Sequence, residues 1–205
     1  TWKHLIKAAI CLWGPENSQQ QFIWHPWAVD IFKESCTNQS REPTRFQSIV
    51  GLAGPGSSGK SRAMAIWALL NWLVDPVHTL IYVTSTSIPR AQDKIWGALE
   101  AHYNALPDSA KGMGKLVNTP TPVIWTEANG VRIKTAGIKL VAMATGSSKE
   151  SIGKLQGAKA NAQAEHRNGR CVLILDELSD LSHAIIPAIE NLKSHDWFSV
   201  QAAAN

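Results

Sequence analysis

A glycine-rich loop that ends in a lysine and a serine is the first place where residue types and spacing point to chemistry. Residues 54–61 read GPGSSGKS and match the pattern G-x-x-x-x-G-K-[ST]. In such loops the glycines let backbone N–H groups turn inwards around phosphate oxygens. Lys60 is expected to reach the β- and γ-phosphates of ATP, and the Ser61 hydroxyl to ligate Mg²⁺. The expected nucleotide-binding residues are Gly54, Gly56, Ser57, Ser58, Gly59, Lys60 and Ser61.

Two adjacent acids form the second candidate group. Residues 171–177 read CVLILDE, so an apolar run delivers both carboxylates at its end. Ligands of open parallel sheets bind beyond the carboxyl ends of the strands, so Asp176 is expected near the glycine-rich loop and is predicted to hold Mg²⁺. Glu177 is expected to point the other way by strand alternation and to orient or deprotonate a water molecule. A solvated acidic turn is the alternative, but the two motifs together favour hydrolysis over binding alone.

Transfer of a phosphoryl group also requires a cation for the charge that develops. Residues 54–59 contain no arginine, so it must come from elsewhere. Arg167 is the candidate that we place among the catalytic residues, because its polar loop precedes the strand of Asp176 and could present it to a neighbouring subunit. A solvated basic loop is the alternative for this segment. The other candidate arginines are Arg62, Arg90, Arg132 and Arg170.

Two further polar segments have a functional and a plain interpretation. Residues 83–92 (VTSTSIPRAQ) could hold a nucleic-acid backbone, or Thr86 or Ser87 could simply cap a helix. The lysines and the glutamine within residues 149–159 could line a polynucleotide channel, or they could belong to an exposed loop.

Apolar runs that alternate with helical patterns predict the elements that position these groups. They predict an α/β fold with a mostly parallel sheet covered by helices on both faces. A leading helical segment is expected in residues 1–45 and a nucleotide-binding core in residues 46–205. Helices are expected at 60–74, 89–104 and 183–193, and loops at 106–122 and 147–165, the latter leading into a helix. Strands are expected at 46–53, 78–84, 122–126, 131–134, 138–144, 171–175 and 198–203, with an Asn-Gly hairpin turn at 129–130.

The composition is that of one globular unit. The chain has 205 residues, of which 44% are hydrophobic and 18% charged, so a single sizeable core is expected. No run approaches the roughly 18 apolar residues that cross a membrane, and no signal segment is visible. Three scattered cysteines indicate reduced thiols in an intracellular protein. The net charge of +4 is compatible with a nucleic-acid partner, but it is weak evidence for one.

The order of several segments resembles one family, the ATPase domain of the large terminase subunits of tailed phages and related viruses. The resemblance covers nearly the whole chain. It rests on HPWAVDIFKE, GPGSSGKS, LIYVTSTSIPRAQDKIW, SIGKLQGAKA, CVLILDELSD and SVQAAAN.

This resemblance implies a RecA-like phosphate-loop ATPase fold with an additional strand. It implies that ATP hydrolysis moves double-stranded DNA into a preformed capsid. The partners would be other copies in a ring docked on the portal and a small terminase subunit, with no membrane. The location would be the cytoplasm of the infected cell, at the procapsid. The family's C-terminal nuclease domain would follow residue 205.

The resemblance also assigns roles and exposes two departures. Lys60 and Ser61 would hold the nucleotide phosphates and Mg²⁺, with Asp176 as the acid that coordinates the metal ion and Glu177 as the catalytic one. Asn205 would fall at the motif that couples hydrolysis to DNA movement. Many terminases have an arginine inside the phosphate loop, which is missing here. An adenine-contacting glutamine is expected in the leading segment, where Trp27 or Ala28 occupies the closest position.

Two other functions remain open from the sequence. A helicase-like ATPase of the same broad fold would prefer single-stranded nucleic acid. A nucleotide-regulated assembly module would bind ATP without hydrolysing it, although Glu177 argues against this.

Overall fold

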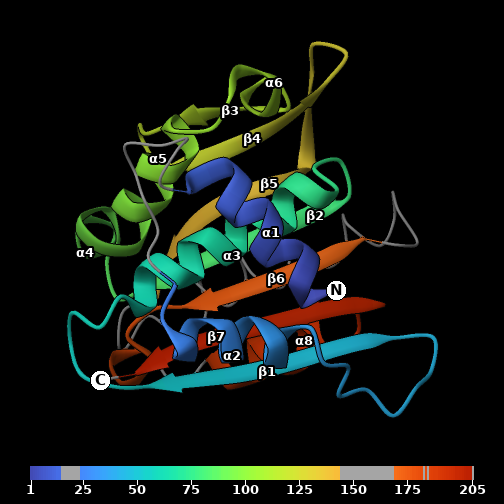
Figure 1. Ribbon diagram of the computed structural model, residues 1–205, viewed down its shortest axis with the longest axis vertical. Coiled ribbons are helices and arrows are strands. Elements are labelled where there is room, and N and C mark those ends of the chain that lie inside the picture. Colours follow the sequence, from blue (N-terminus) through green and yellow to red (C-terminus); the bar gives the residue numbers. More distant parts are fainter. Residues whose placement is uncertain (15–23, 144–168, 182, 184, 205) are drawn as a thin grey trace.

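A computed structural model describes residues 1–14, 24–143, 169–181, 183 and 185–204. Within them, seven strands form one sheet in the order β1-β7-β6-β2-β5-β4-β3 (Figure 1). The first five are parallel, and β4 runs antiparallel to both of its neighbours. The strands are β1 (Phe46–Ala53), β2 (Thr79–Ser85), β3 (Gly114–Val117), β4 (Val123–Ala128), β5 (Val131–Ala142), β6 (Arg170–Leu175) and β7 (Trp197–Ala204).

Helices cover both faces of the sheet. In Figure 1, α1, α2, α3 and α5 lie in front of it and α8 lies behind. None of the helices in the described parts of the chain is long and apolar enough to cross a membrane. The helices are α1 (Trp2–Trp13), α2 (Pro26–Ser35), α3 (Lys60–Val74), α4 (Ile88–Ala91), the π-helical η1 (Gln92–Trp96), α5 (Gly97–Asn104), α6 (Asp108–Lys111), the 3-10 turn η2 (Leu178–Asp180) and α8 (Ile185–Leu192).

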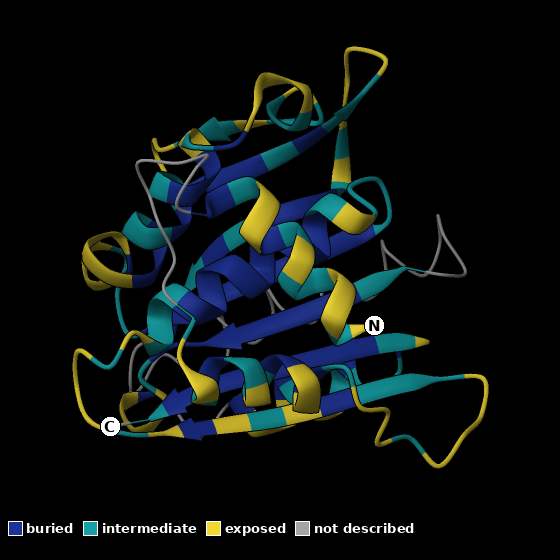
Figure 2. Ribbon diagram, viewed as in Figure 1, coloured by how far each residue is buried: buried dark blue, intermediate teal, exposed yellow. Residues whose placement is uncertain are grey.

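The front face carries the larger core, and α3 is its centre. This helix is buried on nearly every side from Ala63 to Trp72, because the sheet lies on one side of it and α1 and α5 on the other (Figure 2). Trp13, Trp67, Trp72 and Trp96 are all fully buried here. Aromatic side chains contribute the largest buried areas. At least four of the nine tryptophans therefore serve packing.

The back face has a smaller core under α8. Leu173 and Phe198 of the central strands pack with Ile185 and Leu192 of this helix. Strand β6 is buried on both faces from Cys171 to Leu175, as expected for a central parallel strand. The cysteines form no disulfide.

The strand order confirms the predicted fold class. Strand β7 lies between β1, which precedes the glycine-rich loop, and β6, which precedes Asp176 and Glu177. It stands where the resemblance places an additional strand. Because β1, β7, β6 and β2 are parallel, their carboxyl ends meet at one edge of the sheet.

The chain between residues 106 and 142 differs from the prediction. The expected loop at 106–122 contains α6 and β3, which pack beside β4 and α5. The strands expected at 131–134 and 138–144 are one strand, β5. A bulge of residues 134–136 in β5 separates its two paired stretches, and Gly137 directly after it is left-handed (φ 107°). The Asn129-Gly130 turn is confirmed, with φ of 53° and 74°.

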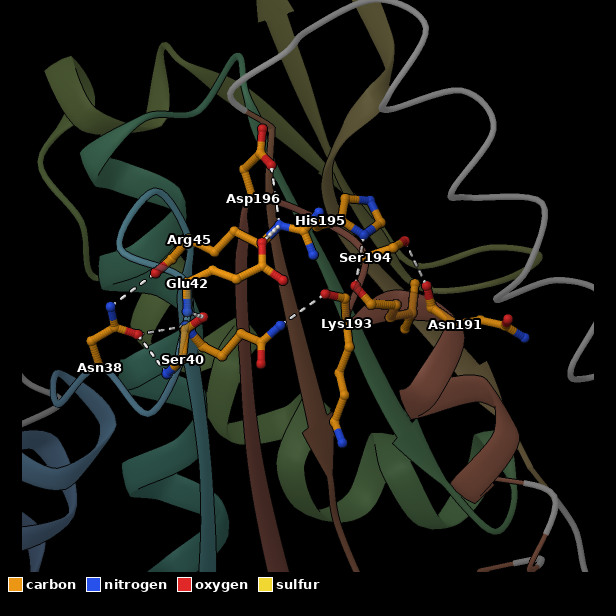
Figure 3. A network of polar contacts seen from close by, with 11 residues as sticks. Asn38, Ser40, Glu42, Arg45, Asn191, Lys193, Ser194, His195 and Asp196 are labelled. Carbon is orange, nitrogen blue, oxygen red and sulfur yellow. Dashed lines mark hydrogen bonds and ion pairs between the residues drawn. The ribbon is translucent and has the colours of Figure 1, made fainter.

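A polar network surrounds the loop before β1, at the amino ends of the parallel strands (Figure 3). Asn38 accepts hydrogen bonds from the backbone N–H of Gln47 and donates one to the carbonyl of Arg45. The amide of Gln39 is bonded to both the N–H and the C=O of Ile49. Two side-chain amides therefore occupy part of the outer edge of β1, where no described strand pairs with it.

Candidate active site

The glycine-rich loop connects the end of β1 to the start of α3. Ser57 (φ 59°) and Gly59 (φ 88°) adopt left-handed conformations that wind the backbone into a tight turn. The Lys60 ammonium donates to the carbonyl oxygens of Gly54 and Pro55, each at 2.7 Å, and to Ser58 Oγ at 3.3 Å. Lys60 therefore lies across the loop rather than in solvent.

Asp176 lies directly beside the first turn of α3. Ser61 Oγ donates to Asp176 Oδ1 at 3.0 Å, although 115 residues separate the two. Asp176 is only 3% exposed. Burial raises the pKa of its carboxyl group, and the hydrogen bond from Ser61 opposes this shift. The other oxygen, Oδ2, is buried and has no hydrogen-bond partner in the structure.

A hydroxyl oxygen beside a half-satisfied carboxylate suits Mg²⁺, which prefers hard oxygen ligands and binds proteins through one or two carboxylates together with substrate phosphates. No cluster of three or more acidic, histidine or cysteine residues occurs in the described parts of the chain. Ser61 and Asp176 therefore offer oxygen ligands that fit such an ion.

Glu177 occupies a different position from the one that strand alternation predicts. Strand β6 ends at Leu175, and Glu177 turns into a left-handed conformation with φ 58° and ψ 51°. Its side chain therefore lines the same cavity as Asp176 instead of pointing away. Non-glycine residues with positive φ are uncommon, and they concentrate at functional sites.

Lys94 is a neighbour of Glu177 that neither sequence motif indicated. Its ammonium forms a close ion pair with Glu177 Oε1, and Arg90 Nη1 lies 4.0 Å from Oε2. The Glu177 side chain is only 10% exposed. Arg90 and Lys94 are four residues apart, so they share one helix face. In the sequence, the four-residue spacing of Arg90 and Lys94, shortly after the strand expected to end at residue 84, is the signal that could have identified both residues.

A π-helical turn positions Lys94. Within η1, Ile95 and Trp96 are buried in the core, whereas Lys94 faces the cavity. A Cβ on Gly97 would come within 2.7 Å of the Gln92 carbonyl oxygen, so the wide turn leaves no room for a side chain there. Single π-turns inside helices frequently mark functional sites.

These residues enclose a cavity of about 440 Å³. Its walls come from the glycine-rich loop, the start of α3, η1, the turn after β6, and the end of β7. It is lined by Gly56, Ser57, Ser58, Gly59, Lys60, Ser61, Arg62, Lys94, Ala98, Asp176, Glu177 and Ala203. The loop and the acid pair, predicted separately, thus meet in one place.

A second cavity, of about 340 Å³, lies on the other side of the loop. Trp27, Asp30 and Ile31 of α2 line it, together with the end of β1 and Pro55. A Cβ on Gly59 would be 3.8 Å from the Trp27 ring, so this indole lies against the loop. The leading segment therefore contributes directly to the surroundings of the glycine-rich loop.

Two candidate arginines lie at the larger cavity. Arg62 lines it and donates from Nε to His102 Nε2 at 3.1 Å. Burial, with a smaller contribution from Arg62, lowers the pKa of His102 to about 4, so the imidazole is neutral and can accept this bond. Arg90 lies between Glu177 and Asp180, 3.9 Å from the latter.

Two other arginines lie far from the cavity. Arg170 was expected in the polar loop just before the strand of Asp176; it is instead the first residue of β6, at the end of that strand opposite Asp176. There it donates to Asn71 and stacks on Trp197. Arg132 stacks on Trp125 at the β4–β5 hairpin. Arg167, Asn205 and the basic residues of 149–159 lie outside the described residues.

The hydroxyl segment after β2 does serve as a cap. Ser87 Oγ accepts a hydrogen bond from the N–H of Arg90 at the start of α4, as the plain interpretation predicts. The hydroxyls of Ser85 and Thr86 are buried and have no hydrogen-bond partner in the structure.

Comparison with known proteins finds similarity among solved structures and none among sequences. No protein family matches the sequence, and no curated protein does. Among solved structures, the ATPase domain of the large terminase of Thermus phage P74-26 is similar, at 15% sequence identity and a TM-score of 0.48. The similarity covers 90% of this chain and 66% of that one, slightly under two thirds of its length.

Proposed function

We propose that this chain hydrolyses ATP in the presence of Mg²⁺. The observation that supports this most directly is the hydrogen bond between Ser61 and Asp176. It joins the glycine-rich loop to the acid pair, so that Lys60, Asp176 and Glu177 line one cavity. Cavities of about 300–1,000 Å³ are typical for small-molecule and cofactor sites.

Each residue has a distinct part in the proposed reaction. The N–H groups of residues 54–59 and the Lys60 ammonium hold the β- and γ-phosphates. Ser61 and Asp176 hold Mg²⁺, which neutralises charge on the phosphate oxygens when bound. Glu177 accepts a proton from the attacking water once its carboxylate is no longer held by Lys94.

A cation for the transferred phosphoryl group is proposed to come from Arg167, as the sequence suggests. In a ring of identical subunits, the loop before β6 would present it to the neighbouring site. The smaller cavity beside Trp27 is proposed to take the adenine base, because the flat indole there lies against the loop.

Hydrolysis is proposed to drive double-stranded DNA into a viral capsid. The support is the ordered resemblance to large terminase subunits across nearly the whole chain. The motor would be a homo-oligomeric ring on the portal of the procapsid in the infected cell, with a small terminase subunit as a further partner.

The test compares Glu177→Gln with the wild type and with Glu190→Gln, a matched change at an exposed glutamate of α8. We expect Glu177→Gln to lower phosphate release by about 10²- to 10⁴-fold, the usual contribution of a general base. Its stabilisation by Mg²⁺-ATP should persist, at about 2.7 kcal/mol when ATP is present at a hundred times Kd. Glu190→Gln should behave like the wild type.

Two results would count against the proposal. Equal phosphate release by the wild type and Glu177→Gln would remove hydrolysis at this site. Stronger stimulation of the wild type by single-stranded than by duplex DNA would replace the packaging motor with the helicase-like alternative.

A further inference from the structure

The three strands at one end of the sheet carry an unusual excess of positive charge. Strands β3, β4 and β5 contain four basic residues, Lys115, Arg132, Lys134 and Lys139, and a single acid, Glu127. The active-site cavity uses none of them. Figure 1 shows these strands at the end of the sheet far from β1, with the β4–β5 hairpin projecting beyond the helices.

The strand register places these cations on the back face. Ile124 and Ile138 are opposite each other and belong to the core under α3, so their neighbours Trp125 and Lys139 face the other way. Lys115 is opposite Trp125 and shares its face. On the other side of the bulge, Thr126 Oγ1 accepts a hydrogen bond from Trp72 Nε1 of α3. Thr126 is opposite Ile133 in the strand register.

Arg132 precedes Ile133 in the paired stretch, so strand alternation turns it to the back face as well. Lys134 follows Ile133 as the first residue of the bulge; it is exposed, and its carbonyl oxygen accepts a hydrogen bond from Lys139 Nζ, which brings it beside the same face. The guanidinium of Arg132 stacks on the Trp125 ring, which confirms that these two side chains share a face. We call the set Lys115, Trp125, Arg132, Lys134 and Lys139 the basic ribbon.

The cations of the basic ribbon have one acid nearby, because Glu127 lies opposite Arg132 in the strand register. None of them forms an ion pair in the described parts of the chain. The Lys139 ammonium donates only to the carbonyl oxygen of Lys134. Burial, and secondarily the charge of Arg132, lower the pKa of Lys139. Neighbouring like charges repel one another, so an anion bound at this face would relieve an existing repulsion.

The form of the surface favours a nucleic-acid backbone over a membrane or an apolar partner. Lys115, Arg132 and Lys134 are exposed. Arg132 and Lys134 are only two residues apart along β5, so their Cα atoms are at most about 7 Å apart. Val131, at the hairpin turn, is the only large exposed hydrophobic residue found in these strands. A two-stranded ribbon is also a form that the major groove of DNA admits.

We propose that the basic ribbon holds the phosphate backbone of duplex DNA. The proposal rests on the DNA-translocating function proposed above and assigns its DNA-contacting surface. Lys115, Arg132 and Lys134 contact phosphates, whereas Lys139 and Trp125 support the ribbon from beneath. Phosphate contacts position a protein on DNA without reading its sequence, as a packaging motor requires.

The strand order also connects this surface to the active site. Strand β2 pairs with β5 on one side and with β6 on the other, and Thr84 is aligned with both Val141 and Leu175. Asp176 donates its N–H to the carbonyl of Thr84. One strand therefore separates the strand of the basic ribbon from the metal-binding acid.

The experiment measures affinity for a random-sequence 30-base-pair duplex by fluorescence anisotropy over a series of salt concentrations. The test variant combines Lys115→Gln, Arg132→Gln and Lys134→Gln. The control variant combines Lys3→Gln, Lys7→Gln and Lys33→Gln, three exposed lysines on the helices α1 and α2 of the front face. Both variants lose three charges, so net charge is matched.

Three lost phosphate contacts should reduce the slope of log K against log salt by about 2.7, at about 0.9 per contact. We expect this reduction in the test variant only. ATP hydrolysis without DNA should equal the wild-type rate in both variants, and stimulation by duplex DNA should be lost in the test variant alone.

The outcomes separate this proposal from the proposed function. A wild type that releases no phosphate would refute the proposed ATPase, whatever its affinity for DNA. Normal hydrolysis with equal salt slopes in the two variants would refute the basic ribbon as the DNA surface. Tighter binding of the wild type to polyglutamate than to the duplex at equal charge would assign the face to an acidic protein and equally overturn the proposal.

Discussion

At the scale of single residues, Asp176 illustrates a conflict between folding and function. Its carboxyl group is buried, one oxygen is bonded to Ser61, and the other has no partner in the structure. Burial raises the pKa of this group in the folded protein. An acid with a raised pKa favours folding while it is protonated and opposes folding once it is ionised. In the empty protein, ionised Asp176 therefore lowers the stability at neutral pH.

We predict that Asp176→Asn stabilises the empty protein at pH 7. Asparagine can still accept the hydrogen bond from Ser61 but carries no charge to bury. A gain of about 1 kcal/mol would raise Tm by about 2–4 °C for a chain of this size. Thermal melts followed by circular dichroism should show the difference shrinking as the pH falls through the raised pKa of folded Asp176 and disappearing below a pH of about 4, where the acid is protonated in both states.

The same variant should lose the Mg²⁺-dependent part of its stabilisation by ATP. A lower Tm than the wild type at pH 7 would contradict the assignment of Asp176 as a destabilising buried charge. Retention of the full Mg²⁺ effect would contradict its assignment as a metal ligand.

Lys94 leads to a second prediction at this scale. Its ion pair occupies the carboxylate that is proposed to accept the proton from water. Lys94→Met should therefore increase ATP hydrolysis without DNA, by about fivefold if the pair contributes about 1 kcal/mol. The measurement is steady-state phosphate release, with Lys111→Met, which removes an exposed pair with Asp108, as the control. A decrease in kcat would show that Lys94 assists the reaction instead.

At the scale of elements, the segment from Ile88 to Asn104 shows how far a sequence pattern reaches. Its helical character was predictable, since proline in the first turn and apolar spacing both favour a helix. The π-helical turn in its middle was not, because it depends on Gly97 and on the packing of Ile95 and Trp96 against α3. That turn brings Lys94 to Glu177.

We predict that Gly97→Ala destabilises the protein. In an ordinary helix interior the change from glycine to alanine is stabilising by about 1 kcal/mol. Here the new Cβ would be 2.7 Å from the Gln92 carbonyl oxygen, and forced overpacking usually costs about 1–3 kcal/mol. The midpoint of urea unfolding should fall. Ala98→Gly, at the next position of the same helix, provides a control for the intrinsic helix preference, and a higher midpoint for Gly97→Ala would show that the turn relaxes freely.

At the scale of the whole molecule, the parallel half of the sheet was more predictable than the antiparallel half. Apolar runs identified β2 and β6, because a strand buried on both faces leaves a continuous apolar signature. Strand β1 is partly exposed, and its apolar run before the glycine-rich loop identified it. Strand β3 has only four residues and no such run. Strand β5 contains a bulge at residues 134–136, which is a property of its pairing with β4 and not of either sequence alone.

The candidate active site was likewise predictable in some parts and not in others. Its two halves were predictable because a phosphate-binding loop and a pair of acids are local patterns. Their meeting followed from the parallel order of the strands. The left-handed turn at Glu177 was not predictable, because it comes after the end of β6, where strand alternation no longer applies. The predicted strand 171–175 begins one residue earlier in the structure, which makes Arg170 its first residue, far from Asp176.

The outer edge of β1 has a consequence for solubility. Unpaired strand edges recruit other chains and start aggregates, and native proteins obstruct them with specific devices. The amides of Asn38 and Gln39 are such a device, because they occupy backbone groups of Gln47 and Ile49 that a second chain would otherwise engage. Ile49 is 41% exposed there, so an uncovered edge would also offer an apolar side chain to a second copy.

Gln39→Ala should therefore make the protein self-associate as its concentration rises, with little change in the fold. Light scattering at increasing concentration would detect the effect, and Gln92→Ala, at another exposed glutamine, should remain monodisperse. One side chain in the loop before β1 would then determine whether copies of this chain stay apart in solution or stack edge to edge.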